Sequence, residues 1–424
     1  MNEERQILPI SPSMKMAWFV VAQLWLISLL NYLDRVMITT MRGSLMDAIP
    51  MTDAQFGLLT SVFLWVYAVL SPFAGFMADR FSRSRVIIIS LFVWSAVTWL
   101  TGHAKTFEQL IAARALMGIS EACYIPAALA LIADYHRGST RSLATGIQES
   151  GIFAGAGLGG LGGWIAERHG WSLPFSIFGI FGIVFSVLLV LTLKDAPRDT
   201  GGVSASPDAV PKVGFGEAMV SLFSRRSFIL ILIFWGLLGV AGWALLAWMP
   251  TYLKEHFHLS QGEAGLSATG YMQAASLVGV LIGGAWADRW SRTNERGRIL
   301  VPVIGLVVAA PAVLLVANAD IFVVLIVGLM VYGLARAFTD SNMMPILCLV
   351  ADPRYRATGF GVLNCFACVV GGLAIYAGGA LRDANVNLSY VFRFAALSLV
   401  VCAVLLFFVK PSRNAAAKSG SVAP

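Results

Sequence analysis

The residues of this sequence best suited to chemistry are ionisable side chains near the middle of long apolar stretches. Seven are found in such places: Asp34, Arg35, Arg114, Glu121, Glu149, Arg336 and Asp340. A charged side chain at the centre of a lipid bilayer costs roughly 2.5–3.5 kcal/mol, so it pairs with another group or faces water. These residues are therefore the candidates for a pathway of protons or polar solutes.

Two sets of these residues could bind an anion and carry a proton. Arg114 and Glu121 are seven positions apart, which puts them on one face of a helix. Arg114 either binds the substrate or only anchors the span and pairs with Glu121. Asp34 and Arg35 are adjacent, so they point about 100° apart and contact different neighbours. An arginine in a dry cavity binds a carboxylate through its planar fork. A carboxylate in that cavity can take up and release a proton, because burial disfavours its charge while a nearby cation favours it.

The remaining ionisable residues allow two interpretations. Arg336 and Asp340 are four positions apart and can bridge within their own helix, so they form either a structural pair or part of a site. Glu149 is either a proton carrier or a residue satisfied by a hydrogen bond to Gln148 or to the backbone. The predicted proton-coupling residues are Asp34, Glu121, Glu149 and Asp340.

Composition places these residues in a membrane. Of 424 residues, 58% are hydrophobic and 12% are charged, whereas a soluble protein carries roughly 25% charged residues. Apolar runs of about 20 residues cross a hydrocarbon core. We predict an all-α membrane protein with twelve transmembrane helices in two pseudo-symmetric six-helix halves. The expected spans are 17–40, 54–78, 86–103, 107–133, 142–165, 171–193, 227–253, 262–287, 299–317, 320–349, 357–380 and 388–409.

Charge in the loops predicts the orientation of the chain. One set of alternate loops and tails holds 21 Lys and Arg residues and the other set holds five. Loops rich in Lys and Arg stay in the cytoplasm, so both termini are expected there. No cleavable signal peptide is visible, and we expect a multi-pass protein of the bacterial inner (plasma) membrane. The net charge of +7 is spread over these loops, which argues against nucleic acid as a partner.

Two repeated motifs indicate an internal duplication. GFMADRFSRSR (75–85) follows the second span and GAWADRWSR (284–292) follows the eighth. Aligning Pro126 with Pro345 puts Glu121 opposite Asp340 and Glu149 opposite Asn364. Transporters built from related halves have this kind of faint symmetry. The predicted domains are an N-terminal half (1–193), a cytoplasmic linker (194–226) rich in Gly, Ser and Pro, a C-terminal half (227–410) and a disordered tail (411–424).

The loop motif GFMADRFSRSR resembles the cytoplasmic loop motif of the major facilitator superfamily. NYLDR (31–35), ARALMGISEA (113–122) and WMPTYL (248–253) are similar to its anion:cation symporter branch, which includes bacterial sugar-acid/proton symporters. NMMP (342–345) and PRYRAT (353–358) resemble the spinster-like transporters, which are associated with lysolipids and sphingolipids.

Charged residues at the cytoplasmic ends of the spans are predicted to gate the protein. Asp79 and Asp288 can pair with basic groups or a helix N-terminus in one conformation and release them in another. The alternative is that the arginines only set orientation. The predicted gating residues are Asp79, Arg80, Arg83, Arg141, Asp288, Arg289 and Arg356.

The resemblance also implies site residues. Asp34 and Arg35 match the Asp-Arg pair in the first span of the sugar-acid symporters, and Glu121 matches their glutamate in the fourth span. Those positions are linked to proton coupling and substrate binding, and the family's spans one, four, seven and ten line a central cavity. The predicted substrate-binding residues are Tyr32, Arg35, Arg114, Gln273, Asn342 and Asn364.

Other classes of function lack support in the sequence. No HExxH motif or nucleophile constellation is visible, and the Cys365–Cys368 CxxC has no second pair or nearby histidine. We therefore predict a transporter, not an enzyme, with no cofactor and no metal. The expected function is proton-coupled symport of a small organic anion, such as a sugar acid, by a monomer that alternates access. The alternative is a spinster-like carrier of a lysolipid or other amphipathic lipid.

Overall fold

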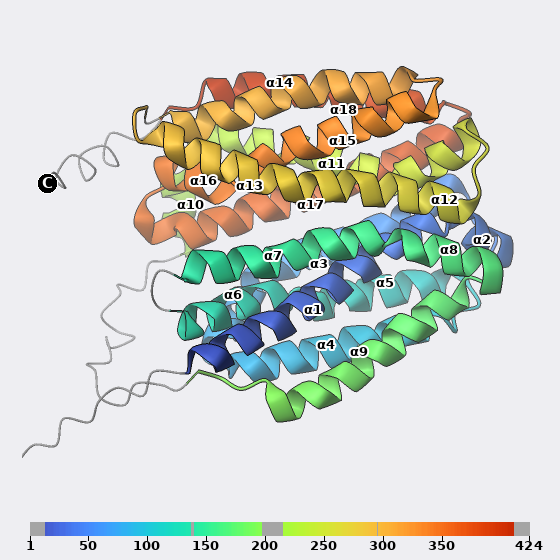
Figure 1. Cartoon of the computed structure of the whole chain (residues 1–424), viewed down its shortest axis with the longest axis horizontal. Coiled ribbons are helices and arrows are strands. Elements are labelled where there is room, and N and C mark those ends of the chain that lie inside the picture. Colours follow the sequence, from blue (N-terminus) through green and yellow to red (C-terminus); the bar gives the residue numbers. More distant parts are fainter. Residues whose placement is uncertain (1–12, 137–139, 197–214, 295, 411–424) are drawn as a thin grey trace, which may run out of the picture.

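A computed structural model describes residues 13–136, 140–196, 215–294 and 296–410. Over these residues the chain is helical and contains no β-strand. Figure 1 shows two groups of roughly parallel helices lying side by side. The N-half consists of α1 (Met14–Thr40), α2 (Arg42–Ala48), α3 (Asp53–Arg80), α4 (Arg83–Thr101), α5 (Phe107–Glu121), α6 (Tyr124–Tyr135), α7 (Arg141–Leu158), α8 (Gly160–His169) and α9 (Ser172–Thr192).

The second group of helices is the C-half. It consists of α10 (Phe215–Phe223), α11 (Arg226–His256), α12 (Gln261–Leu266), a π-helical turn (Ser267–Tyr271), α13 (Met272–Ser291), α14 (Gly297–Asn318), α15 (Phe322–Asp340), α16 (Met343–Val350), a 3₁₀ turn (Pro353–Tyr355), α17 (Arg356–Asp383) and α18 (Leu388–Phe407). Part of the predicted linker is thus the helix α10, which packs on α11. Residues 197–214 of that linker and the predicted tail lie outside the described residues.

Eleven helical segments of the described chain are long and apolar enough to cross a membrane. The predicted span 142–165 corresponds to α7 and α8, which are separated at Gly159. Its glycines, together with Gln148 and Glu149, make it less apolar than the other spans. The all-α membrane fold is confirmed. The α7–α8 segment lies at the position of the fifth predicted span and is the one predicted span that is not among the eleven.

The fourth and tenth predicted spans are broken at matching positions. Glu121 is the last residue of α5 and Asp340 is the last residue of α15. Pro126 is the third residue of the next helix, α6, and Pro345 is the third residue of α16. Proline has no N–H to bond the carbonyl four residues earlier, and its ring clashes with that carbonyl. The break therefore places an acidic side chain at a helix end in each half.

The two halves meet mainly at the following helix pairs. α3 packs on α17, α1 on α11, α7 on α13, and α8 on α12. Within the halves, α1 packs on α7 and α4 on α9, while α15 packs on both α13 and α14. We call the end where α1 begins and α18 ends the terminal side, and the opposite end the distal side (Figure 1).

Candidate functional site

A buried ion pair lies at the centre of the N-half. The Nε of Arg35 on α1 is 2.7 Å from Oε2 of Glu121 at the end of α5, and the two side chains are 3% and 0% exposed. The same carboxylate oxygen accepts a hydrogen bond of 2.9 Å from Nδ2 of Asn31. Glu121 Oε1 and Arg35 Nη2 have no hydrogen-bond partner among the described residues. The pair therefore has unused capacity to bind on both sides.

Aromatic rings surround the guanidinium of Arg35. Its Cζ lies 4.8 Å from the ring centroid of Tyr32, 4.9 Å from that of Phe63 and 4.6 Å from that of Tyr67. A cation over an aromatic face gains about 0.5–2 kcal/mol, most when water is absent. The second arginine of the N-half, Arg114, has its Cζ 4.8 Å from Phe63 and so shares this ring. Phe63 was not among the predicted residues.

The adjacent acid, Asp34, points to a different neighbour, as its offset from Arg35 predicts. It is 2% exposed and its Oδ2 accepts a hydrogen bond of 3.2 Å from Thr98 on α4. It interacts electrostatically with Glu121 and Arg114. The structure thus brings four predicted site residues into one buried cluster within the N-half: Asp34, Arg35, Arg114 and Glu121.

The C-half holds a more accessible ion pair. Arg336 Nη1 on α15 lies 3.2 Å from Asp340 Oδ2, one turn along the helix, and the side chains are 27% and 22% exposed. Both residues interact electrostatically with Tyr32 of the N-half, so the pair faces the junction between the halves. The intrahelical bridge predicted from their spacing is present.

Glu149 on α7 is exposed and lies within electrostatic reach of Asp340. Its neighbour Gln148 is buried and donates a hydrogen bond of 2.6 Å to Ser28 Oγ. Among the described residues no hydrogen bond joins Gln148 to Glu149, so the first of the two hydrogen bonds predicted to satisfy this carboxylate is not found there. A carboxylate on each half thus faces the junction.

The remaining predicted binding residues are dispersed. Asn342 is buried at the break between α15 and α16, where it donates to the carbonyl of Phe338 at 2.9 Å and to Ser341 Oγ at 3.1 Å. Gln273 is half-buried where α13 packs on Gly157, and Asn364 is half-buried on α17. Asn342 is therefore occupied in supporting the helix break.

On the terminal side, the predicted gating residues make contacts within their own half. Arg83 binds Asp134, Arg298 donates to Asp288 Oδ1 at 3.0 Å, and Arg356 donates to the carbonyl of Cys348 at 3.0 Å. Three further predicted residues are exposed: Arg80, Arg141 and Arg289. The side chain of Asp79 lies outside the described part of the chain.

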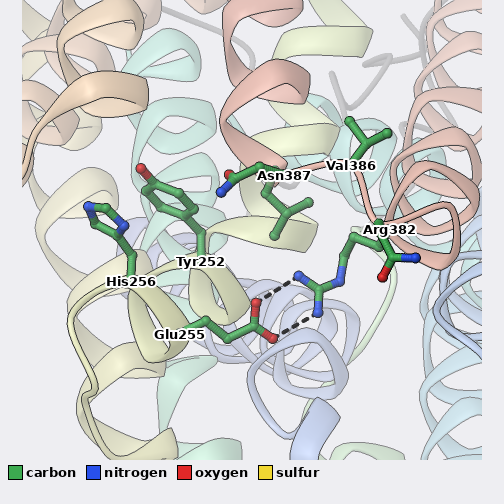
Figure 2. Close-up of a pocket in the computed structure, with 8 residues that line it drawn as sticks. Tyr252, Glu255, His256, Arg382, Val386 and Asn387 are labelled. Atoms are coloured by element: carbon green, nitrogen blue, oxygen red, sulfur yellow. Dashed lines mark hydrogen bonds and ion pairs between the residues drawn. The ribbon is translucent and has the colours of Figure 1, made fainter.

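On the distal side, an ion network joins the two halves. Arg382 at the end of α17 donates to Glu255 through Nη1 and Nη2 at 2.7 and 2.8 Å, as Figure 2 shows. Its Nε also donates to Asp53 Oδ2 of the N-half at 3.0 Å, and Arg42 binds the same aspartate. The Glu255–Arg382 pair borders a polar surface cavity of about 360 Å³. Sequence reasoning missed this network, because it used the distal arginines only as a count for orientation.

Comparison with known proteins identifies the family. The model of the Major Facilitator Superfamily matches residues 24–375 and 240–423. The chain belongs to this superfamily. It is 29% identical to an MFS-type efflux pump of Mycolicibacterium smegmatis, over 87% of this chain and 85% of that protein. It is 24% identical to a probable sulfoacetate transporter of Cupriavidus necator, over 92% and 93% of the two chains.

A solved structure has the same fold. This is a bacterial homologue of the human lysosomal transporter spinster in an inward-facing, unoccupied conformation, with a TM-score of 0.74, 23% identity, and coverage of 94% of this chain and 96% of that one. The protein is therefore a multi-pass membrane transporter of the major facilitator fold and not an enzyme.

Proposed function

We propose that this transporter is a proton-coupled symporter of a small organic anion, a sugar acid or another carboxylate or sulfonate of similar size. The observation that carries this proposal is the sealed Arg35–Glu121 pair with Asp34 beside it. Two acids and an arginine with free bonding positions supply both functions that such a symporter needs. The similarity to a protein named as a sulfoacetate transporter supports the substrate class.

The pair couples the proton to the anion by competition. While Glu121 is ionised, its carboxylate occupies the guanidinium of Arg35. Protonation of Glu121 removes that charge and leaves the Arg35 guanidinium free to bind an anion. Arg114, which contacts the same Phe63 ring, adds to the attraction. Asp34 is the second proton carrier. Because proton and anion each favour the binding of the other, the two bind and leave together.

The proposed setting follows from the loop charges. The terminal side faces the cytoplasm of a bacterium, so the distal ion network closes the extracellular side of the inner membrane protein. The protein works as a monomer, and the two halves rock about the junction where Tyr32, Arg336 and Asp340 meet.

The second candidate is a spinster-like carrier of an amphipathic lipid, which the similarity to the spinster homologue favours. Val69 and Phe73 on the terminal part of α3 are 60% and 66% exposed, so this helix presents apolar surface there. A lipid carrier of this kind would move its substrate without a carboxylate binding to Arg35.

Uptake by proteoliposomes distinguishes the two candidates. The substrates are D-glucarate, sulfoacetate and a lysophosphatidylcholine, each with and without an acidic exterior. We expect the acidic exterior to accelerate uptake of an acid, and Glu121→Gln to abolish the acceleration while exchange of acid across the membrane continues. The matched control is Glu108→Gln, which changes an exposed glutamate on the same helix. Lysolipid movement that ignores pH, with no uptake of either acid, would establish the second candidate.

A further inference from the structure

The arginines that could hold an anion differ in how open they are. Arg35 and Arg114 are 4% and 1% exposed, and aromatic rings cover both guanidiniums. The Arg336 side chain is 27% exposed, and among the described residues it makes one hydrogen bond of 3.2 Å, to Asp340. Its Nε has no hydrogen-bond partner among the described residues. In this conformation Arg336 is the arginine of the three that an incoming solute can reach.

The surroundings of Arg336 leave room beside its charge. A Cβ built on Gly242 of α11 would lie 3.5 Å from Nη2, so a bare glycine flanks the guanidinium. Tyr332, one turn earlier on α15, is buried with its hydroxyl unpartnered among the described residues. Tyr32 lies between the two ion pairs, because it interacts with both Arg35 and Arg336.

We propose that Arg336 is the first binding point for the anion of the substrate and that Asp340 is its built-in competitor. This inference rests on the proposed function and adds a second site to it, in the C-half. The carboxylate or sulfonate displaces Asp340 from Arg336 and accepts hydrogen bonds from Nε and from the Tyr332 hydroxyl. The substrate is a small acid, and the part of it beyond the carboxylate or sulfonate contacts the ring of Tyr32.

The competition makes binding at Arg336 depend on pH. The titratable groups facing Asp340 are Arg336 and Tyr332 on α15, Tyr32 on α1 and Glu149 on α7. With both carboxylates ionised, the junction carries two negative charges against one positive charge and repels an anion. Protonation of one acid brings the net charge of the junction to zero, and protonation of both makes it positive, so anion binding at Arg336 strengthens as the pH falls.

Calorimetric titration of the purified protein with sulfoacetate and D-glucarate, at mildly acidic and mildly alkaline pH, tests this site. We expect Arg336→Gln to weaken binding by at least about tenfold, through loss of a charge-assisted contact. Asp340→Asn should bind more tightly than the wild type at alkaline pH, since Arg336 has lost its competitor. Arg393→Gln, an exposed arginine of the same half that binds Asn318, is the control and should bind as the wild type does.

Two outcomes contradict the inference, and they differ in whether the proposed function is refuted as well. If the wild type binds an acid and Arg336→Gln binds it equally well, the C-half site is refuted while the proposed function stands. If the wild type binds neither acid, both are refuted. Arg336→Lys guards against misfolding, because it retains the ion pair with Asp340 and still loses the fork.

A separate observation concerns how the halves hold one another on the distal side. The carboxylate of Asp383, the last residue of α17, accepts hydrogen bonds of 2.9 Å from the backbone N–H groups of Asp53 and Ala54. N–H groups in the first turn of a helix have no hydrogen-bond partner within that helix, and a negative charge is favoured there. The C-half therefore caps a helix of the N-half.

The reverse contact is also present. Oε2 of Glu167 on α8 accepts a hydrogen bond of 2.9 Å from the N–H of Gly262, in the first turn of the helix 261–291. α8 and α17 belong to the fifth and eleventh predicted spans, and α3 and α12 to the second and eighth. Each half thus contributes an acid to the equivalent helix of the other half.

Each capped helix also has a cap of its own. The side chains of Thr52 and Gln55 cap α3 from within the N-half, and those of Ser260 and Glu263 form a capping box on α12. Each of these helix ends therefore keeps a cap when the acid of the other half is removed. We infer that Asp383 and Glu167 are reciprocal latches that hold the distal side closed, and that both must release before this side opens.

Spin labels on the two halves test the latches. The five native cysteines are replaced by serine, and cysteines for labelling are introduced at Lys105 and Asp320, which are exposed on the distal side of the N-half and the C-half. The distance between the two labels is then measured. Asp383→Ala and Glu167→Ala should each raise the population of the longer distance by about tenfold, and the double variant by more. Glu263→Ala removes a cap at the same helix end within one half, so it should leave the distances unchanged. Unchanged distances in the double variant, or an equal change in Glu263→Ala, would refute the latches.

Discussion

Replacement of Glu121 by glutamine separates the charge of the buried pair from its shape. Arg35 would keep its place among three aromatic rings and lose its ionised partner at 2.7 Å. Removing one partner of a buried pair costs roughly 3–5 kcal/mol, because the other charge is left uncompensated. The rings and the amide oxygen compensate part of that loss. We therefore expect Glu121→Gln to lower the free energy of unfolding by about 3 kcal/mol.

Thermal unfolding of the purified protein measures this loss, with and without sulfoacetate. For about 3 kcal/mol we expect the unfolding midpoint to fall by roughly 3 °C. Added sulfoacetate should restore stability to Glu121→Gln more than it raises that of the wild type, since the anion replaces the missing charge. Glu108→Gln, exposed in the first turn of the same helix, should lower the midpoint much less than Glu121→Gln does. A Glu121→Gln protein as stable as the wild type, with no larger response to the anion, would refute the pairing as the basis of coupling.

Three further predictions concern the binding fork and the distal closure. Arg35→Lys should weaken acid binding at least about tenfold in calorimetric titration, because an ammonium cannot reproduce the planar fork; wild-type affinity would contradict this. Arg382→Gln should shift the spin-label distances toward the open distal side, since it removes the hydrogen bond from Arg382 Nε to Asp53 that joins the halves; unchanged distances would show that this bond does not hold the distal side closed. Gly379→Ala should slow transport severalfold by keeping the distal side from closing, as its Cβ would lie 2.2 Å from the carbonyl oxygen of Asp53. The control is Gly361→Ala on the same helix, which meets no atom within 4 Å and should transport normally.

The sequence predicts the fold because a bilayer imposes few solutions. Apolar runs must be helices, and the repeated motifs relate the two halves. The alignment of Pro126 with Pro345 also predicts that Glu121 and Asp340 are equivalent, and both prove to end a helix at a break. The fifth span is less apparent from hydropathy, because its glycines serve close helix contact. Gly155 is an example, since a Cβ there would lie 2.1 Å from the carbonyl oxygen of Leu29.

The candidate site is only partly readable from the sequence. Mid-span charges are conspicuous because they are costly, and this identifies Arg35 and Glu121. Phe63 is one of 26 phenylalanines, so nothing in its type marks it as a cover for Arg35. Asp383 and Glu167 lie at span ends where charge is expected, and their contact with a helix of the other half depends on tertiary structure alone.

Proton uptake on anion binding tests the central claim most directly. Sulfoacetate or D-glucarate would be added to the purified protein in weakly buffered solution, and the change in pH followed with an indicator dye. Binding should draw protons from the solution, and Glu121→Gln should bind the anion while drawing fewer. Tight binding of the acid by the wild type with no proton uptake at any pH would contradict the account.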